Sequence, residues 1–267
     1  MVENQKTSFY TFMQLITDIG NSDIVFGIYK DEQWQHLWRT ASNKERSLDD
    51  FKLFFLGMLS QNNIQVESVE SIVLSSVVPS LTEVILEMLE SIFDKKVVLV
   101  HWSIYSKLNI TITTNEKEIG TDLVANAVAG FHYAKSACVV VDFGTALTFT
   151  SIDKKGYIQG VAIAPGIKTA MQALASNAAQ LPEIPLELPK SAIGKNTIHA
   201  IQAGILYGYV GLVKEILNQT KSELGTCKVI ATGGLSHVLT PLHSEFDLID
   251  KSLTLNGLRL IGKMVLK

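Results

Sequence analysis

The stretch Val139-Val140-Val141-Asp142-Phe143-Gly144-Thr145-Ala146-Leu147-Thr148-Phe149 decides the predicted fold. Its apolar run is typical of a buried strand, its glycine allows a tight turn, and the residues after the turn predict a returning strand. A carboxylate before a glycine turn suits a hydrated cation beside a phosphate, because backbone N–H groups there can face phosphate oxygens. Asp-x-Gly is also ordinary hairpin chemistry, so the motif alone leaves both interpretations open.

A second copy of this motif stands near the N-terminus, at Asp18-Ile19-Gly20-Asn21-Ser22. Each copy follows an apolar strand and opens a run of three predicted strands, which indicates duplication of a supersecondary unit. Two similar lobes explain this repeat better than one mixed sheet does. With pseudo-twofold symmetry, the two Asp-Gly turns would face each other across a cleft.

The segments around these motifs predict an α/β layer in each half. Ser47 suits the N-cap of an amphipathic helix that ends near Asn62, and Pro79 stops an apolar strand. The other predicted strands are 14–18, 24–29, 36–40, 72–78, 97–100, 138–142, 146–151, 157–163 and 227–232. The other predicted helices are 81–89, 167–177, 197–223 and 254–265, and residues 178–196 form an irregular connector with three prolines.

The composition bounds the class of protein. The 267 residues are 47% hydrophobic, which is enough for one large domain or two smaller ones. A formal charge of −3 without a Lys/Arg block gives no reason to expect nucleic acid or an anionic membrane as partner. Two cysteines, Cys138 and Cys227, imply no disulfide framework and favour a reducing compartment. The N-terminus lacks a signal-peptide layout and we find no run of about 18 apolar residues, so we expect a cytoplasmic protein that spans no membrane.

Other short motifs narrow the chemistry. Thr232-Gly233-Gly234 follows a strand, and its backbone could pack against a nucleotide or form a plain turn. Gly194-Lys195-Asn196-Thr197 resembles the end of a P-loop, but Pro189 stands where the first glycine is needed. No dinucleotide fingerprint and no Gly-x-Ser-x-Gly elbow is present, and the six histidines show no close metal-ligand spacing.

Asp122 opens the helix that leads into the second half. An Asp at a helix N-terminus is commonly a cap, but the same position keeps a carboxylate ionised and lets it act as a base. Gly204, Gly208 and Gly211 lie within another predicted helix, where each costs about 1 kcal/mol relative to Ala. We expect them to permit close packing against another backbone, inside a lobe or at a dimer interface.

Together these stretches resemble the type III pantothenate kinases of bacteria, which belong to the superfamily of acetate kinase, sugar kinases, Hsp70 and actin. The resemblance runs from about residue 14 over nearly the whole chain. The matching blocks, in order, are Asp18–Ser22, Ser75–Pro79, Gly120–Asp122, Asp142–Ala146, Ile163–Gly166, Leu181-Pro182, Gly194–Thr197 and Thr232–Gly234.

The resemblance implies an α/β fold of two duplicated ribonuclease H-like (actin-like ATPase) lobes, residues 13–128 and 129–267, with a nucleotide cleft between them. It implies transfer of the ATP γ-phosphoryl group to pantothenate, the first step towards coenzyme A, by a cytoplasmic homodimer that uses Mg²⁺. Asp122 would be the base, and Asp142 would bind a monovalent cation, K⁺ or NH₄⁺. The implied ATP-binding residues are Asp18, Ile19, Gly20, Asn21, Ser22, Asp23, Ile24, Val25, Thr145, Gly233 and Gly234. The implied substrate-binding residues are Gly120, Thr121, Asp122, Leu123 and Thr197.

The acceptor side departs from the family pattern. Leu123 stands where the family has an Arg that anchors an anionic substrate, and Thr113 and Glu116 stand where it has an aromatic residue and a proline. Other cations could bind the substrate carboxylate instead, namely Lys107, Lys117 and Lys168. Two further functions stay open: a non-catalytic relative that regulates or binds a partner, and a kinase for another small hydroxy-acid or amide.

Overall fold

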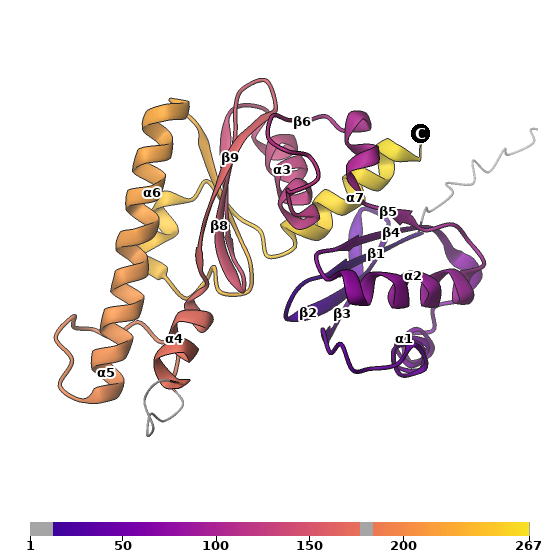
Figure 1. Ribbon diagram of the computed structural model, residues 1–267, viewed down its shortest axis with the longest axis horizontal. Helices are drawn as coiled ribbons and strands as arrows, with labels where there is room; N and C mark the ends of the chain where they lie inside the picture. The colour runs from indigo at the N-terminus through magenta and orange to yellow at the C-terminus, as the bar shows by residue number, and fades with distance from the viewer. Residues whose placement is uncertain (1–12, 177–183, 267) are drawn as a thin grey trace, which may run out of the picture. The chain divides into compact units, whose positions relative to one another are not determined.

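Two mixed β-sheets form the frame of the computed structural model, which describes residues 13–176 and 184–266 (Figure 1). The chain divides at Val100 and His101 into two units with one sheet each. This division differs from the predicted boundary between residues 128 and 129, because helix α3 (Thr121–Ala134) packs against the C-terminal helix α7 (Leu253–Val265) and so belongs wholly to the second unit.

The first unit is built on a five-stranded sheet of order β3-β2-β1-β4-β5. Strands β1, β2 and β3 form an antiparallel meander, while β4 and β5 join it in parallel. Its elements are β1 (Met13–Ile19), β2 (Asp23–Lys30), β3 (Gln33–Ala41), α1 (Leu48–Gln61), η1 (Val66–Ser68), β4 (Val69–Ser76), α2 (Pro79–Phe93) and β5 (Val98–Leu99).

The second unit repeats this plan and adds an edge strand. Its sheet has the order β11-β10-β7-β8-β9-β6. The first five repeat the meander with two parallel neighbours, and β6 pairs in parallel with β9. Besides α3 and α7, its elements are η2 (Trp102–Lys107), β6 (Thr111–Ile112), β7 (Cys138–Phe143), β8 (Ala146–Ile152), β9 (Tyr157–Pro165), α4 (Ile167–Ser176), α5 (Thr197–Gln202), η3 (Ala203–Tyr207), α6 (Gly208–Leu224), β10 (Lys228–Thr232), η4 (Thr240–Glu245) and β11 (Leu248–Ile249).

The strand registers confirm the duplication predicted from the two Asp-Gly motifs. Asp18 lies opposite Val25 on β2 and Ser75 on β4, and Asp142 lies opposite Thr148 on β8 and Thr232 on β10. Each carboxylate therefore sits near the end of the central strand of its sheet, between an antiparallel and a parallel neighbour. Two short strands, β6 and β11, were not predicted, because two residues are too few for a hydrophobic period to show.

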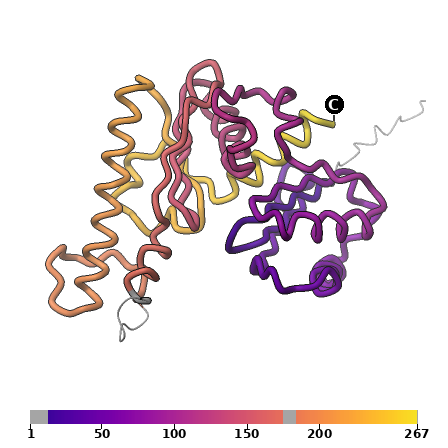
Figure 2. Tube along the Cα trace, viewed as in Figure 1, coloured from indigo at the N-terminus to yellow at the C-terminus, as the bar shows by residue number. Residues whose placement is uncertain are grey.

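Helices cover the sheets as the apolar patterns predict. In the first unit, α1 and α2 pack on one face of the sheet around Phe26 and Phe55, whose ring centroids are 4.9 Å apart. Ser47 caps α1 as predicted, with a reciprocal bond to Asp50. In the second unit, α4 and α6 lie on one side of the sheet and α3 and α7 on the other (Figure 1). The Cα trace shows the same layering (Figure 2).

The longest helical segment, Thr197–Leu224, runs through α5, a π-helical turn and α6. It has 28 residues, and the mean hydropathy of its most apolar 18-residue window is 1.2, so it is long and apolar enough to cross a membrane by length and composition only. Leu206, Val213 and Leu217 nevertheless pack in the core of the second unit. One third of its most apolar window is buried, and Ile205, Val210 and Ile216 pack against the same core from its margin.

The glycines of this helix do not pack as expected inside the unit. Gly204, Gly208 and Gly211 are exposed, and a Cβ added at any of them would meet nothing within 4 Å. The three glycines therefore do not permit close packing within the described chain. Of the two expected roles, close packing at a dimer interface is the one still open.

The two cysteines are free thiols, as predicted. Cys138 begins β7 and is fully buried, and burial raises its pKa to about 12. Cys227 is half-buried beside β10. Cys138 is therefore a poor nucleophile in the folded protein, because the thiolate is the reactive form.

Candidate active site

Asp142 lies at the end of β7 and begins the turn that the sequence singles out. Val139, Val141 and Phe143 point into the core under α4 and α6, so the alternating strand turns Asp142 towards α3 and α7. Gly144 N–H donates to the carbonyl of Ala146 at 3.1 Å, which closes the turn. Burial, together with the charge of Asp122, raises the pKa of Asp142 to about 6, although a hydrogen bond from Asn126 opposes the shift.

Two glycines from other segments pack directly on this turn. Gly233 has a φ of +89°, and an added Cβ would lie 2.6 Å from Asp142 Oδ1 and from the Phe143 carbonyl. A Cβ on Gly166 would overlap the carbonyl oxygens of Gly144 and Thr145. The turn is thus held between two backbones that no larger residue allows to approach so closely.

The carbonyl of Thr145 is also fixed. It accepts hydrogen bonds from Gly166 N–H at 3.0 Å and from Thr169 Oγ1 at 2.8 Å. Tyr209 on α6 donates to the carbonyl of Pro165 at 2.6 Å and so secures the segment that carries Gly166. A turn with its carbonyls engaged is preorganised to present N–H groups to an anion.

Asp122 is the second residue of α3, not its N-cap. Gly120 occupies the N-cap and offers no side chain, and Asp122 Oδ1 accepts the N–H of Leu123 at 2.8 Å. Burial raises the pKa of Asp122, and this backbone hydrogen bond partly offsets the rise. The carboxylate therefore both satisfies a helix terminus and is a stronger base than an exposed Asp.

Tyr105 belongs to the surroundings of Asp122, although no sequence motif marks it. Its side chain is 4% exposed on the 3₁₀-helix η2. Burial, with the charges of Asp122 and Glu116, raises the pKa of Tyr105 to about 12. The phenol therefore stays protonated and can donate a hydrogen bond.

The turn of the first unit has a different character. Gly20 N–H donates to the Asp23 carbonyl at 2.9 Å, and Ser42 Oγ donates to the Gly20 carbonyl at 2.6 Å. Asn21 and Ser22 are exposed, so their backbone is accessible to a ligand. Asp23 pairs with Arg39 at 2.8 Å.

Two of the predicted ATP-binding residues have their side chains in the hydrophobic core. Ile19 and Ile24 are fully buried, so only their backbone could contact a nucleotide. Asp18 and Val25 are half-buried.

The residues that depart from the family pattern on the acceptor side mostly pack against the rest of the second unit. Leu123 is 9% exposed and contributes an apolar surface beside Asp122. Thr113 Oγ1 donates to the Ile158 carbonyl on β9. All three alternative cations, Lys107, Lys117 and Lys168, are exposed, and Lys117 Nζ lies 4.9 Å from the centroid of the Trp102 ring.

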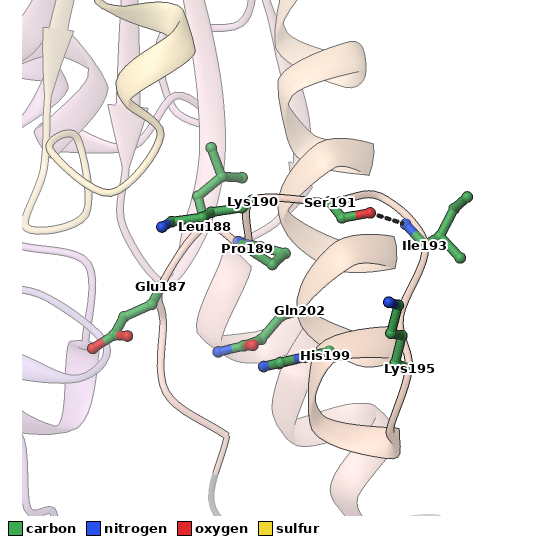
Figure 3. A pocket seen from close by; sticks show the side chains of 9 residues that line it. All are labelled: Glu187, Leu188, Pro189, Lys190, Ser191, Ile193, Lys195, His199 and Gln202. Carbon is green, nitrogen blue, oxygen red and sulfur yellow. Dashed lines mark hydrogen bonds between the residues drawn. The ribbon is translucent and has the colours of Figure 1, made fainter.

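The block that resembled a P-loop end is a helix cap. Asn196 Oδ1 accepts the His199 N–H at 2.9 Å, and Gly194 packs against the first turn of α5. Thr197 starts that helix and is exposed. Beside it is a cavity of about 380 Å³ (Figure 3), whose lining residues are Glu187, Leu188, Pro189, Lys190, Ser191, Ile193, Lys195, His199 and Gln202. None of the predicted site residues lines this cavity.

The second unit brings Asp122, Asp142, Thr145 and Gly233 into one neighbourhood, linked through Asn126, Gly166 and the glycine turns. Gly234 follows Gly233 and is exposed. Asn126 and Gly166 were missed as site residues. Asn126 lies one helical turn after Asp122, which is the spacing that could have identified it.

Solved structures share this architecture. A protein from Campylobacter jejuni described as a Baf family transcriptional activator superposes with a TM-score of 0.59 and 20% identity, over 93% of this chain and 97% of that one. A protein from Sinorhizobium meliloti described as a 2-dehydro-3-deoxygalactonokinase superposes with a TM-score of 0.57 and 10% identity, over 94% of this chain and 96% of that one. The duplicated sheets with their carboxylate turns thus define the two-lobed nucleotide-binding fold of the actin-like ATPases and sugar kinases.

Sequence similarity then identifies the family within this class of fold. The model of the type III pantothenate kinase family matches residues 14–219. A type III pantothenate kinase of Citrifermentans bemidjiense is 41% identical over 250 residues, which is 93% of this chain and 98% of that protein. The chain belongs to the type III pantothenate kinase family.

Proposed function

We propose that this protein phosphorylates the hydroxyl group of pantothenate with ATP, giving 4'-phosphopantothenate in the first step of coenzyme A biosynthesis. The observation that carries the proposal is the pair Asp122 and Asp142. One carboxylate has a raised pKa at a helix N-terminus, and the other begins a turn locked between Gly166 and Gly233. Phosphoryl transfer needs little else than a base, donors for the phosphates and cations.

Asp122 is the proposed general base. Burial raises its pKa, which makes the carboxylate a stronger base for the hydroxyl proton than an exposed Asp would be. The positive end of α3 keeps the carboxylate ionised until that proton arrives. Gly120, Thr121 and Leu123 would line the acceptor beside it, and Tyr105 would donate from η2.

The two Asp-Gly turns would hold the nucleotide phosphates through backbone N–H groups. Residues 18–25 would act in the first unit, with Thr145, Gly233 and Gly234 in the second. Asp18 would hold Mg²⁺, which typically binds one or two carboxylates and the phosphate oxygens while keeping its waters. Mg²⁺ neutralises phosphate charge when bound.

Asp142 is proposed to bind a monovalent cation, K⁺ or NH₄⁺. Asn126 occupies Oδ2 of the carboxylate, while Oδ1 faces Gly144 and Gly233. Directly opposite in the strand register is Thr148, whose buried hydroxyl has no hydrogen-bond partner within residues 13–176 and 184–266. An oxygen-only donor set fits a hard cation. Such a cation adds positive charge beside the transferred phosphate.

We propose further that the protein is a cytoplasmic homodimer. The exposed side of Thr197–Leu224, where Gly204, Gly208 and Gly211 leave the backbone open to close approach, would be covered by a second copy. Thr197 would contact the acceptor from the partner copy. Two free thiols suit a reducing compartment.

An ADP-release assay coupled to NADH oxidation tests the proposal. ATP, Mg²⁺ and K⁺ are supplied with and without pantothenate, and 4'-phosphopantothenate is identified by mass spectrometry. We expect ADP release that depends on pantothenate. Bound ATP without turnover on pantothenate would contradict the proposal, and turnover with another hydroxy-acid in the same assay would reassign the acceptor.

A further inference from the structure

The inner side of the Asp142 carboxylate meets two polar residues from two helices. Asn126 on α3 donates from Nδ2 to Asp142 Oδ2 at 2.9 Å, and Thr254 on α7 donates from Oγ1 to Asn126 Oδ1 at 2.8 Å. We propose that Asn126 and Thr254 are positioning residues that fix the Asp142 carboxylate for cation binding. This inference rests on the monovalent-cation site of the proposed function.

The direction of each hydrogen bond carries the argument. A side-chain amide can present either its oxygen or its nitrogen to a neighbour, and its partners decide which. The ionised carboxylate of Asp142 only accepts, so it takes the amide nitrogen of Asn126, and the Thr254 hydroxyl donates to the amide oxygen and holds the amide in that orientation. A reversed amide would place one oxygen against another. Thr254 therefore acts on the carboxylate through Asn126.

Burial makes both hydrogen bonds of Asn126 necessary. Asn126 is 1% exposed, so both of its polar atoms need protein partners to replace lost water. One turn after Thr254, Gly257 lies so close to α3 that an added Cβ would overlap the Ala125 carbonyl. This close helix crossing brings the Thr254 hydroxyl within reach of Asn126, so the register of α7 on α3 sets the geometry.

The two carboxylate oxygens of Asp142 have separate surroundings. Oδ2 is held from the helix side by Asn126, whereas Oδ1 lies near Gly233 and Gly144, at the locked turn. With Oδ2 fixed, rotation of the carboxylate is restricted and Oδ1 stays directed at the turn. Hydrogen bonds that orient a ligating group in this way typically contribute 10- to 100-fold to metal affinity.

The test compares two substitutions at one position in the full-length protein. Thr254→Val keeps the shape of the side chain and removes the donor, whereas Thr254→Ser keeps the donor and removes a methyl group. The melting temperature of each protein is recorded against KCl concentration without nucleotide or acceptor, with tetramethylammonium chloride holding ionic strength constant. The half-saturating K⁺ concentration is read from the K⁺-specific rise.

We expect Thr254→Val to raise the half-saturating K⁺ concentration about 10-fold or more, and Thr254→Ser to stay within about 3-fold of the unaltered protein. Asn126→Ala should abolish the K⁺-specific rise. A merely structural role would lower the melting temperature of Thr254→Val equally at all K⁺ concentrations, and that result would overturn the proposal. Equal K⁺ dependence in all variants would overturn it as well.

The readout separates this inference from the proposed function. A K⁺-specific rise that Thr254→Val weakens supports the positioning role even if pantothenate gives no turnover. Pantothenate turnover without any K⁺-specific rise in the unaltered protein would leave the kinase assignment standing and overturn the positioning role together with the cation site.

Discussion

The chemistry proposed for Asp122 depends on a single ionisable oxygen, so an isosteric amide is the sharpest change. Asp122→Asn keeps a hydrogen-bond acceptor for the Leu123 N–H but cannot take a proton. We expect kcat for ADP release to fall about 10²- to 10⁴-fold, the range that general-base catalysis contributes. Circular dichroism and thermal melting should match the unaltered protein.

The control for this substitution is Asp49→Asn, which makes the same chemical change at an exposed position in the first turn of α1. Its kcat should be unchanged. An Asp122→Asn protein with more than about a tenth of the parent activity would remove Asp122 from the role of base.

Asp142 should make the free energy of unfolding depend on pH. Its folded-state pKa of about 6 is above the ordinary 3.8, so between these values the folded state binds more protons than the unfolded state. The free energy of unfolding should therefore fall as pH rises from about 4 to about 6, by up to about 3 kcal/mol at 1.36 kcal/mol per pKa unit.

Urea denaturation in K⁺-free buffer across this pH range measures the effect. Asp142→Asn should lose this part of the slope, because the amide does not titrate. Added K⁺ should reduce the fall in the unaltered protein, since a bound cation favours the ionised carboxylate. Stability that rises with pH over the same interval, with a slope unchanged by Asp142→Asn, would contradict the burial argument.

At the scale of the elements, the crossing of α7 on α3 leaves no room for a larger residue at Gly257. Gly257→Ala would place a methyl group against the Ala125 carbonyl, and overpacking of this kind costs about 1–3 kcal/mol. Gly57→Ala is the matched control, because Gly57 is also inside a helix but has nothing within 4 Å of an added Cβ. There the gain in helix propensity should stabilise by up to about 1 kcal/mol.

Chemical denaturation of both glycine variants separates packing from propensity. We expect opposite signs for the two changes in the free energy of unfolding. A stabilised Gly257→Ala protein would show that α3 and α7 can move apart without loss, which would also weaken the case for the Thr254 contact.

The elements were predictable where a long pattern or a turn signal marks them. The Ser47 cap, the Pro79 stop and the two Asp-Gly turns each have a local physical cause, and each was placed correctly. The partners of Asp142 were not predictable in this way. Asn126 and Thr254 are 128 positions apart, and nothing in a local sequence window says that their helices cross.

At the scale of the whole molecule, the exposed face of Thr197–Leu224 makes a prediction about assembly. Gly208→Glu would put a charged side chain where the proposed dimer needs close approach, so the protein should become monomeric. Light scattering after size exclusion gives the mass. Ser222→Glu, at an exposed position near the end of the same helix, is the control and should keep the mass of the parent.

A Gly208→Glu protein that keeps the parent mass would exclude this face as the dimer contact. A monomeric parent would exclude the homodimer itself.

Cys138 gives the molecule an internal reporter. Both cysteines belong to the second unit, and Cys138 is fully buried at the start of its central strand with a pKa near 12. A thiol reagent can therefore modify Cys227 in the native state but must wait for sheet opening to reach Cys138. The slow phase of alkylation thus times the opening of one unit alone, while the cysteine-free first unit is silent.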